Sequence, residues 1–128
     1  MEKKRILLVD DEPSFTRLLK LNLEHTGRYE VREEHQGDHV LRVVEEFRPD
    51  VIFLDVVMPD MDGAGVGGIL RDHPVFKHIP VVFITAIVSR DEVGTQGHII
   101  GDNLFLAKPV KVEDVIRCIE EKTKEVHT

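Results

Sequence analysis

The sequence has few of the features that mark secreted, membrane or nucleic-acid-binding proteins. Its single cysteine, Cys118, cannot form an internal disulfide, which favours a reducing compartment. Its apolar runs are much shorter than the ~20 residues of a membrane span, and the run after the basic N-terminus is too short for a signal-peptide core. Seventeen basic and twenty-four acidic residues give a net charge of −7, whereas phosphate contacts need clustered Lys and Arg. We therefore expect a cytoplasmic protein that binds neither membranes nor nucleic acid.

What the chain does contain is enough apolar sequence for one folded domain. It has 128 residues, of which 41% are hydrophobic and 32% charged, so disorder throughout is excluded. We find no low-complexity tract, internal repeat or linker. We therefore expect residues 1–128 to form a single domain, with no second, output domain in this chain.

Short apolar segments alternate with segments of helical spacing along the whole chain. The predicted strands are residues 6–9, 29–33, 51–54, 80–85 and 104–107, with 29–33 at an edge because it alternates with polar residues. The predicted helices begin at Pro13, with Phe15, Leu18 and Leu19 on the buried stripe, and continue at residues 40–47, 64–71, 89–100 and 112–119. Glycines inside 64–71 and 89–100 predict a short or irregular third helix, unless they allow close packing, and a weak fourth one. This alternation predicts an α/β fold, a five-stranded parallel sheet with helices on both faces.

Four of the five predicted strands end in a residue that can do chemistry. Asp10 and Asp11 follow the first strand, Asp55 the third, Thr85 ends the fourth and Lys108 follows the fifth. In a parallel sheet these ends meet at one edge, where three carboxylates would repel each other by about 4 kcal/mol per pair at an effective dielectric near 20. Mg²⁺ would relieve this repulsion and leave room for phosphate oxygens. The pattern predicts phosphoryl transfer onto Asp55, with Thr85 and Lys108 binding phosphoryl oxygens.

Four motifs in order closely resemble the receiver domain of two-component response regulators. They are Leu8-Val9-Asp10-Asp11-Glu12-Pro13, Leu54-Asp55-Val56-Val57-Met58-Pro59-Asp60-Met61-Asp62-Gly63, Ile84-Thr85-Ala86 and Leu106-Ala107-Lys108-Pro109. The resemblance covers essentially the whole chain and implies the flavodoxin-like strand order 2-1-3-4-5. It also implies a signalling switch, not a turnover enzyme, that receives its phosphoryl group from a sensor histidine kinase or a histidine phosphotransfer protein.

The same resemblance implies a role for each matching residue. Asp55 is the expected phosphoryl acceptor, and Asp10, Asp11, Asp55 and the backbone carbonyl of Val57 are the expected Mg²⁺ ligands. Asp11 is expected to bind the metal directly and Asp10 partly through water.

The remaining roles concern phosphate binding and switching. Lys108 is the expected phosphate-binding lysine, followed by a candidate cis peptide at Pro109. Thr85 is the expected switch hydroxyl and Phe105 the switch aromatic. Their movement would remodel the surface of the fourth helix, fifth strand and last helix, which we expect to contact an output domain or protein, or a second copy in a homodimer.

One departure from the family pattern bears on the lifetime of the phosphoryl group. Val57 and Ile87 lie two residues beyond Asp55 and Thr85, at positions that in the family flank the path of attacking water. Both are apolar here, which predicts slow autodephosphorylation.

Two other classes of protein compete with this interpretation. A phosphoaspartate hydrolase also uses Asp and Mg²⁺, but such enzymes usually have Asp-x-Asp after the first strand, whereas this chain has Asp10-Asp11-Glu12. A flavodoxin-like electron carrier needs a Ser/Thr/Gly-rich phosphate loop at the same place, where these three acids would repel phosphate.

Overall fold

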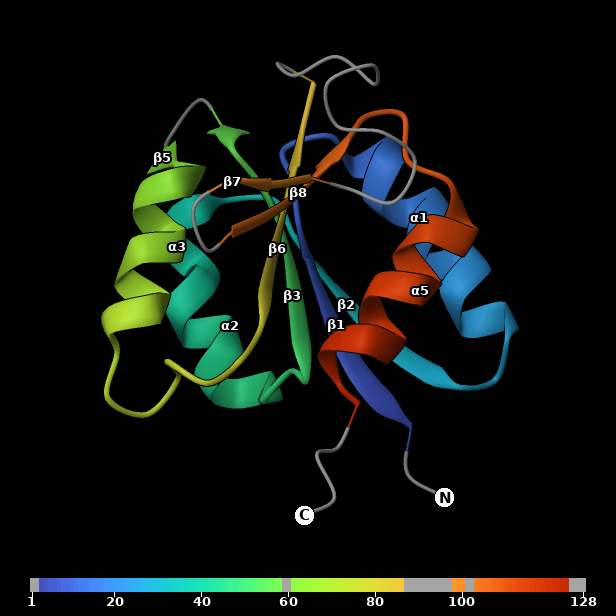
Figure 1. Cartoon of the computed structure of the whole chain (residues 1–128), viewed down its shortest axis with the longest axis horizontal. Coiled ribbons are helices and arrows are strands. Elements are labelled where there is room, and N and C mark those ends of the chain that lie inside the picture. Colours follow the sequence, from blue (N-terminus) through green and yellow to red (C-terminus); the bar gives the residue numbers. More distant parts are fainter. Residues whose placement is uncertain (1–2, 59–60, 87–97, 101–102, 125–128) are drawn as a thin grey trace.

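A twisted parallel sheet forms the centre of the computed structural model, which describes residues 3–58, 61–86, 98–100 and 103–124 (Figure 1). Its five parallel strands follow the order β2-β1-β3-β6-β8, which confirms the predicted fold. Their bounds are β1 (Lys4–Val9), β2 (Tyr29–Glu34), β3 (Val51–Asp55), β6 (Val81–Thr85) and β8 (Asn103–Ala107). As predicted, the partly polar β2 lies at an edge.

Helices cover both faces of this sheet. Figure 1 shows α1 (Pro13–His25) and α5 (Val112–Lys122) on one face, and α2 (Val40–Phe47) and α3 (Gly63–Asp72) on the other. A 3₁₀ turn, η1 (Gly37–His39), precedes α2. No helix in the described ranges is both long and apolar enough to cross a membrane.

The central strand β3 is buried along its whole length, as expected for a strand between two helical layers. Its side chains alternate between two apolar clusters. Phe53 packs in the cluster that contains Leu19 of α1 and Ile119 of α5. Leu54 packs in the cluster that contains Val43 of α2 and Leu70 of α3. Pairing with β1 on one side and β6 on the other sets the register of β3, and so the position of Asp55 at its end.

The structure corrects the predicted fourth helix. Residues 98–100 of the predicted 89–100 segment form a strand, β7 (His98–Ile100), antiparallel to β8; residues 89–97 lie outside the described ranges. Ile99 and Ile100 favour extended structure, and β8 offers an unpaired edge on that side. The polar turn expected after Met58 is flanked by a pair of two-residue strands, β4 (Val57–Met58) and β5 (Met61–Asp62).

The buried stripe of α1 also differs from the prediction. Leu18 is 63% exposed, whereas Thr16, Leu19 and Leu23 are buried. These three positions follow the i, i+3, i+7 spacing of one helix face, so Thr16 takes the place assigned to Leu18.

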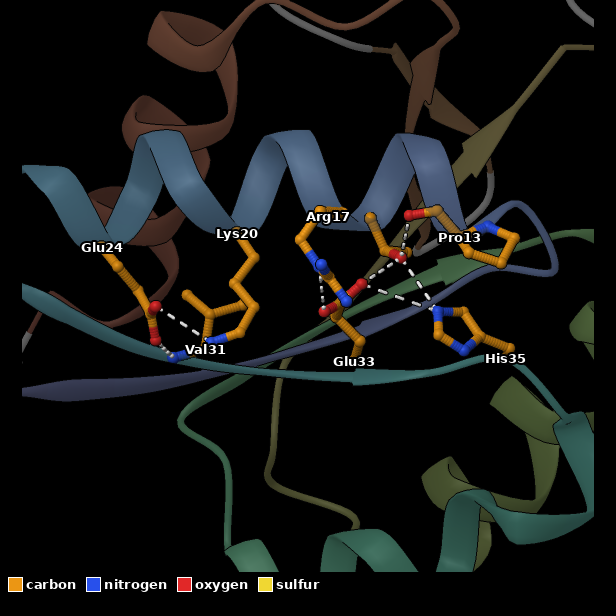
Figure 2. Close-up of polar contacts among 8 residues, drawn as sticks. Pro13, Arg17, Lys20, Glu24, Val31, Glu33 and His35 are labelled. Atoms are coloured by element: carbon orange, nitrogen blue, oxygen red, sulfur yellow. Dashed lines mark hydrogen bonds and ion pairs between the residues drawn. The ribbon is translucent and has the colours of Figure 1, made fainter.

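Thr16 is tolerated in the interior because its hydroxyl has polar partners on β2 and on the residue that follows it. It donates to Glu33 Oε1 over 2.6 Å, and His35 Nε2 lies 3.0 Å from the same hydroxyl. Figure 2 shows Arg17 beside Glu33, and Glu24, near the other end of the helix, beside Val31. These contacts attach α1 to β2 at two points along the helix.

Glycine in α3 allows close packing, and the expected irregularity is not observed. α3 is continuous from Gly63 to Asp72. A Cβ atom on Gly67 would lie 2.5 Å from Cζ of Phe83, so only glycine fits at this contact. A Cβ atom on Gly68 would meet nothing within 4 Å.

Candidate functional site

The predicted site residues meet at the carboxyl edge of the sheet, which we call the rim. Parallel pairing aligns Val9 with Leu54, and Asp55 with Ile84. The backbone N–H of Lys108 donates to the carbonyl of Thr85 over 2.9 Å. The pairing therefore brings the ends of β1, β3, β6 and β8 together, although up to 98 positions separate them in the sequence.

Three carboxylates form the centre of the rim. Asp10, Asp11 and Asp55 each offer an oxygen within 4.8 Å of the other two. Asp10 and Asp55 are only 1% and 4% exposed, whereas Asp11 is partly exposed. Oδ2 of Asp10 is buried, and its polar partner is the Lys108 ammonium. An all-oxygen set of this kind, with one partly exposed member, fits a hard divalent cation such as Mg²⁺.

Lys108 supplies the positive charge of the rim. Its Nζ lies 2.7 Å from Asp10 Oδ2, 2.7 Å from Glu12 Oε1 and 3.8 Å from Asp55 Oδ2. Partial burial lowers the pKa of Lys108, but hydrogen bonds and charges from the surrounding carboxylates outweigh burial and raise it above its ordinary value. Lys108 is therefore a cation at physiological pH. The ammonium also lies 4.7 Å from the ring centroid of Phe15.

Burial has the opposite effect on Asp10. Desolvation raises the pKa of this carboxyl above its ordinary value, although Lys108 and the backbone N–H of Glu12, which donates to Oδ1 over 2.9 Å, oppose the shift. The Lys108 ammonium thus does not fully offset the cost of burying this carboxylate. A further cation would favour the ionised form of Asp10.

Glu12 has no role predicted from the sequence, yet its carboxylate is one of the two nearest partners of Lys108. The two residues are 96 positions apart, so no local spacing indicates the contact. One signal was available: Glu12 directly follows two rim acids and precedes Pro13, the first residue of α1. Any side chain there begins at the rim.

The expected switch residues lie on adjacent strands. Thr85 is 2% exposed at the end of β6. Phe105 is half-buried on β8, and its ring stacks on Phe83 with centroids 5.1 Å apart. Phe83 in turn packs against Gly67 of α3. A continuous line of contacts thus runs from β8 to α3.

Three other predicted positions have different outcomes. The peptide bond between Lys108 and Pro109 is cis, as predicted. Val57 lies in β4, directly after the loop residue that follows Asp55. Ile87 lies outside the described residues.

Bacterial regulatory proteins are similar to this chain in sequence and structure. The response regulator PleD of Caulobacter vibrioides is 44% identical over 108 residues, which are 83% of this chain and 23% of that protein. The transcriptional regulatory protein TrcR of Mycobacterium tuberculosis is 34% identical over 114 residues, 88% of this chain and 42% of that protein. This chain therefore spans less than half the length of either relative.

The structural similarity extends over nearly the whole chain. The chemotaxis response regulator CheY4 of Vibrio cholerae superposes with a TM-score of 0.77 at 26% identity, covering 94% of this chain and 99% of that one. The family model of the response regulator receiver domain matches residues 6–120. On this match, the chain belongs to the response regulator receiver domain family.

Proposed function

We propose that this receiver domain is a phosphorylation-dependent switch of a two-component system, with Asp55 as its phosphoryl acceptor. Family membership supports the switch, and the rim geometry supports the residue. The main observation is that Asp55 lies within reach of two other carboxylates and 3.8 Å from the Lys108 ammonium. We expect the donor to be a phosphohistidine on a sensor kinase or a phosphotransfer protein.

In the proposed reaction a carboxylate oxygen of Asp55 attacks phosphorus. The new O–P bond gives an acyl phosphate, and the bond from phosphorus to the donor breaks with its electron pair on the donor atom. Lys108 and Thr85 each bind a phosphoryl oxygen. Because the ends of β6 and β8 already hold these two residues at the rim, only side-chain movement is needed to reach the phosphoryl group.

Mg²⁺ fits the same set of residues. Asp10, Asp11 and Asp55, with the carbonyl of Val57, would hold it. When bound, the ion would neutralise negative charge on the phosphoryl oxygens. The all-oxygen composition of this set supports the assignment.

The proposed output begins at Thr85. Its hydroxyl would move toward the phosphoryl group, and Phe105 would change its packing in response. Because Phe105 lacks a hydroxyl, packing alone holds either rotamer. Among the described residues the affected surface comprises β7, β8 and α5, and it would contact an output domain, a partner protein or a second copy of this chain. Residues 1–128 are proposed to form a single receiver domain, and the cytoplasmic location stays a prediction.

A phosphoaspartate hydrolase is the alternative with the same nucleophile and metal. It would turn over a generic phosphoester such as p-nitrophenyl phosphate, whereas the proposed switch would take up one phosphoryl group and keep it. A phosphatase assay with this substrate separates the two classes.

The assignment of Asp55 is tested by labelling the protein with acetyl phosphate and measuring intact mass. We expect one phosphoryl group per chain in the presence of Mg²⁺, and none after chelation or in Asp55→Asn. Asp38→Asn removes an exposed carboxylate on η1 and should label like the wild type. Equal labelling of Asp55→Asn and wild type would refute the assignment.

A further inference from the structure

Glu12 holds the side of Lys108 that faces solvent. We propose that Glu12 selects between phosphoryl donors, favouring those that transfer phosphorus from nitrogen over acyl phosphates. This inference rests on the proposed function of Asp55 and Lys108. It assigns Glu12 as a positioning residue, because its carboxylate contacts Lys108 and acts on the phosphoryl group through it.

The three carboxylates around Lys108 differ in exposure. The side chains of Asp10 and Asp55 are 2% and 6% exposed, and that of Lys108 itself is 13% exposed. The side chain of Glu12 is 58% exposed. Glu12 is thus the partner on the open side of the ammonium, the side accessible to a donor. Ion pairs with an exposed partner are weak, so this contact is readily broken.

Only the side chain of Glu12 is free to leave. Its backbone N–H donates to Asp10 Oδ1 over 2.9 Å, and its carbonyl accepts from the N–H groups of Phe15 and Thr16 at the start of α1. When the Glu12 carboxylate swings out, its backbone therefore stays in place. The negative charge then remains close to the rim while the donor binds.

The contacts of the Lys108 ammonium explain why the Glu12 carboxylate has to be released. Its ammonium lies within hydrogen-bond distance of Asp10 and Glu12, each 2.7 Å away, whereas Asp55 is 3.8 Å away. A phosphoryl oxygen that approaches the ammonium from its exposed side meets the Glu12 carboxylate and has to displace it. Asp10 and Asp55 are buried and are required at the reaction centre, so Glu12 is the one that yields.

The negative charge of the displaced Glu12 carboxylate discriminates between the leaving groups of the two donors. From acetyl phosphate, the P–O bond breaks and acetate leaves with the electron pair as an anion, which Glu12 repels. From phosphoramidate, whose nitrogen is protonated, the P–N bond breaks and neutral ammonia leaves with the electron pair. In both cases the new bond joins phosphorus to Asp55. Glu12 therefore raises the energy of the transition state with acetyl phosphate. It attracts the positively charged nitrogen of phosphoramidate.

The test compares labelling rates with these two donors in wild type and Glu12→Gln, which keeps the side-chain length and removes the charge. We expect the ratio of the acetyl phosphate rate to the phosphoramidate rate to rise roughly twofold to fivefold, the range for one exposed ion pair. Glu45→Gln, an exposed position on α2, is the matched control and should leave the ratio unchanged.

A second readout requires no phosphoryl transfer. The ¹⁵N signal of the Lys108 ammonium should shift in Glu12→Gln and stay in place in Glu45→Gln. Labelling with an unchanged ratio, or an unshifted Lys108 signal, would overturn this inference alone. A wild-type protein that takes no label from either donor would overturn the proposed function and this inference together.

Discussion

Lys108 lies among carboxylates of unequal exposure, and this difference determines which of its ion pairs is easily broken. Buried Asp10 lies on one side of the ammonium and exposed Glu12 on another, each 2.7 Å away. The contact with Asp10 is costly to break because it would leave a buried carboxylate without a partner. The contact with Glu12 is easily broken because water can replace it.

The sequence predicted the rim residues that parallel topology dictates, and it missed the one that topology does not dictate. Asp10, Asp55, Thr85 and Lys108 each follow or end a strand, so their convergence follows from the sheet alone. Glu12 lies in the turn before α1, where a long side chain has several directions open to it. Its contact with Lys108 depends on the final packing.

The lifetime of the phosphoryl group is a prediction at the scale of two residues. We expect it to be minutes or longer, because Val57 and Ile87 would neither orient nor admit an attacking water. Val57→Asn combined with Ile87→Glu should shorten it by at least about tenfold, a modest part of what general base catalysis supplies. Loss of the label after removal of the donor, followed by intact mass, measures the lifetime.

Val57→Ile keeps the position apolar and serves as the control. A wild-type lifetime of seconds that the polar pair does not change would contradict the prediction.

At the scale of elements, the glycine content of residues 64–71 predicted a short or irregular helix, but α3 is continuous because a glycine allows close packing. The cost of glycine, about 1 kcal/mol relative to alanine, is real for an isolated helix. In α3 the missing Cβ of Gly67 makes room for the Phe83 ring. Sequence periodicity does not reveal this, because Phe83 lies on another element.

Substitution of the two adjacent glycines separates packing from helix propensity. Gly67→Ala should lower the free energy of unfolding by about 1–2 kcal/mol, because overpacking against buried Phe83 outweighs the propensity gain. Gly68→Ala, with open space at its Cβ, should raise it by up to about 1 kcal/mol. Urea denaturation measures both values. Equal stabilisation by the two substitutions would rule out the close contact with Phe83.

The attachment of α1 to β2 leads to a prediction about pH. Burial alone would raise the pKa of Glu33, but the Thr16 hydroxyl, Arg17 and His35 together lower it. A carboxylate with a lowered folded pKa stabilises the fold above its unfolded pKa, and this contribution is lost as pH falls through the folded value. Thr16→Val should therefore cost about 1–3 kcal/mol near neutral pH and less at about pH 3.

The control for this prediction is Thr123→Val at the end of α5. The Thr123 hydroxyl donates to the carbonyl of Ile119 over 2.6 Å, and this acceptor does not titrate. Its loss should lower stability by a similar amount at both pH values. Urea denaturation at each pH gives the comparison, and a Thr16→Val cost independent of pH would contradict the role of Glu33.

At the scale of the whole molecule, one sheet connects the acidic rim to the surface expected to signal. The line of contacts from Phe105 through Phe83 to Gly67 passes through the α2–α3 side of the sheet. α1 and α5 cover the opposite face. A change in the packing of Phe105 on β8 would therefore reach α3 through Phe83.

The five-strand order was predictable because alternating strands and helices have few topologies. The added edge strand β7 was not, because its pairing depends on the free edge of β8 and not on its own weak pattern.

The most direct test of the central claim is to locate the phosphoryl group on the wild-type protein. Borohydride reduces an aspartyl phosphate to homoserine, and peptide mass mapping then identifies the position. After labelling with acetyl phosphate and Mg²⁺, we predict homoserine at residue 55, the end of β3. Homoserine at another aspartate, with position 55 unmodified, would contradict the account.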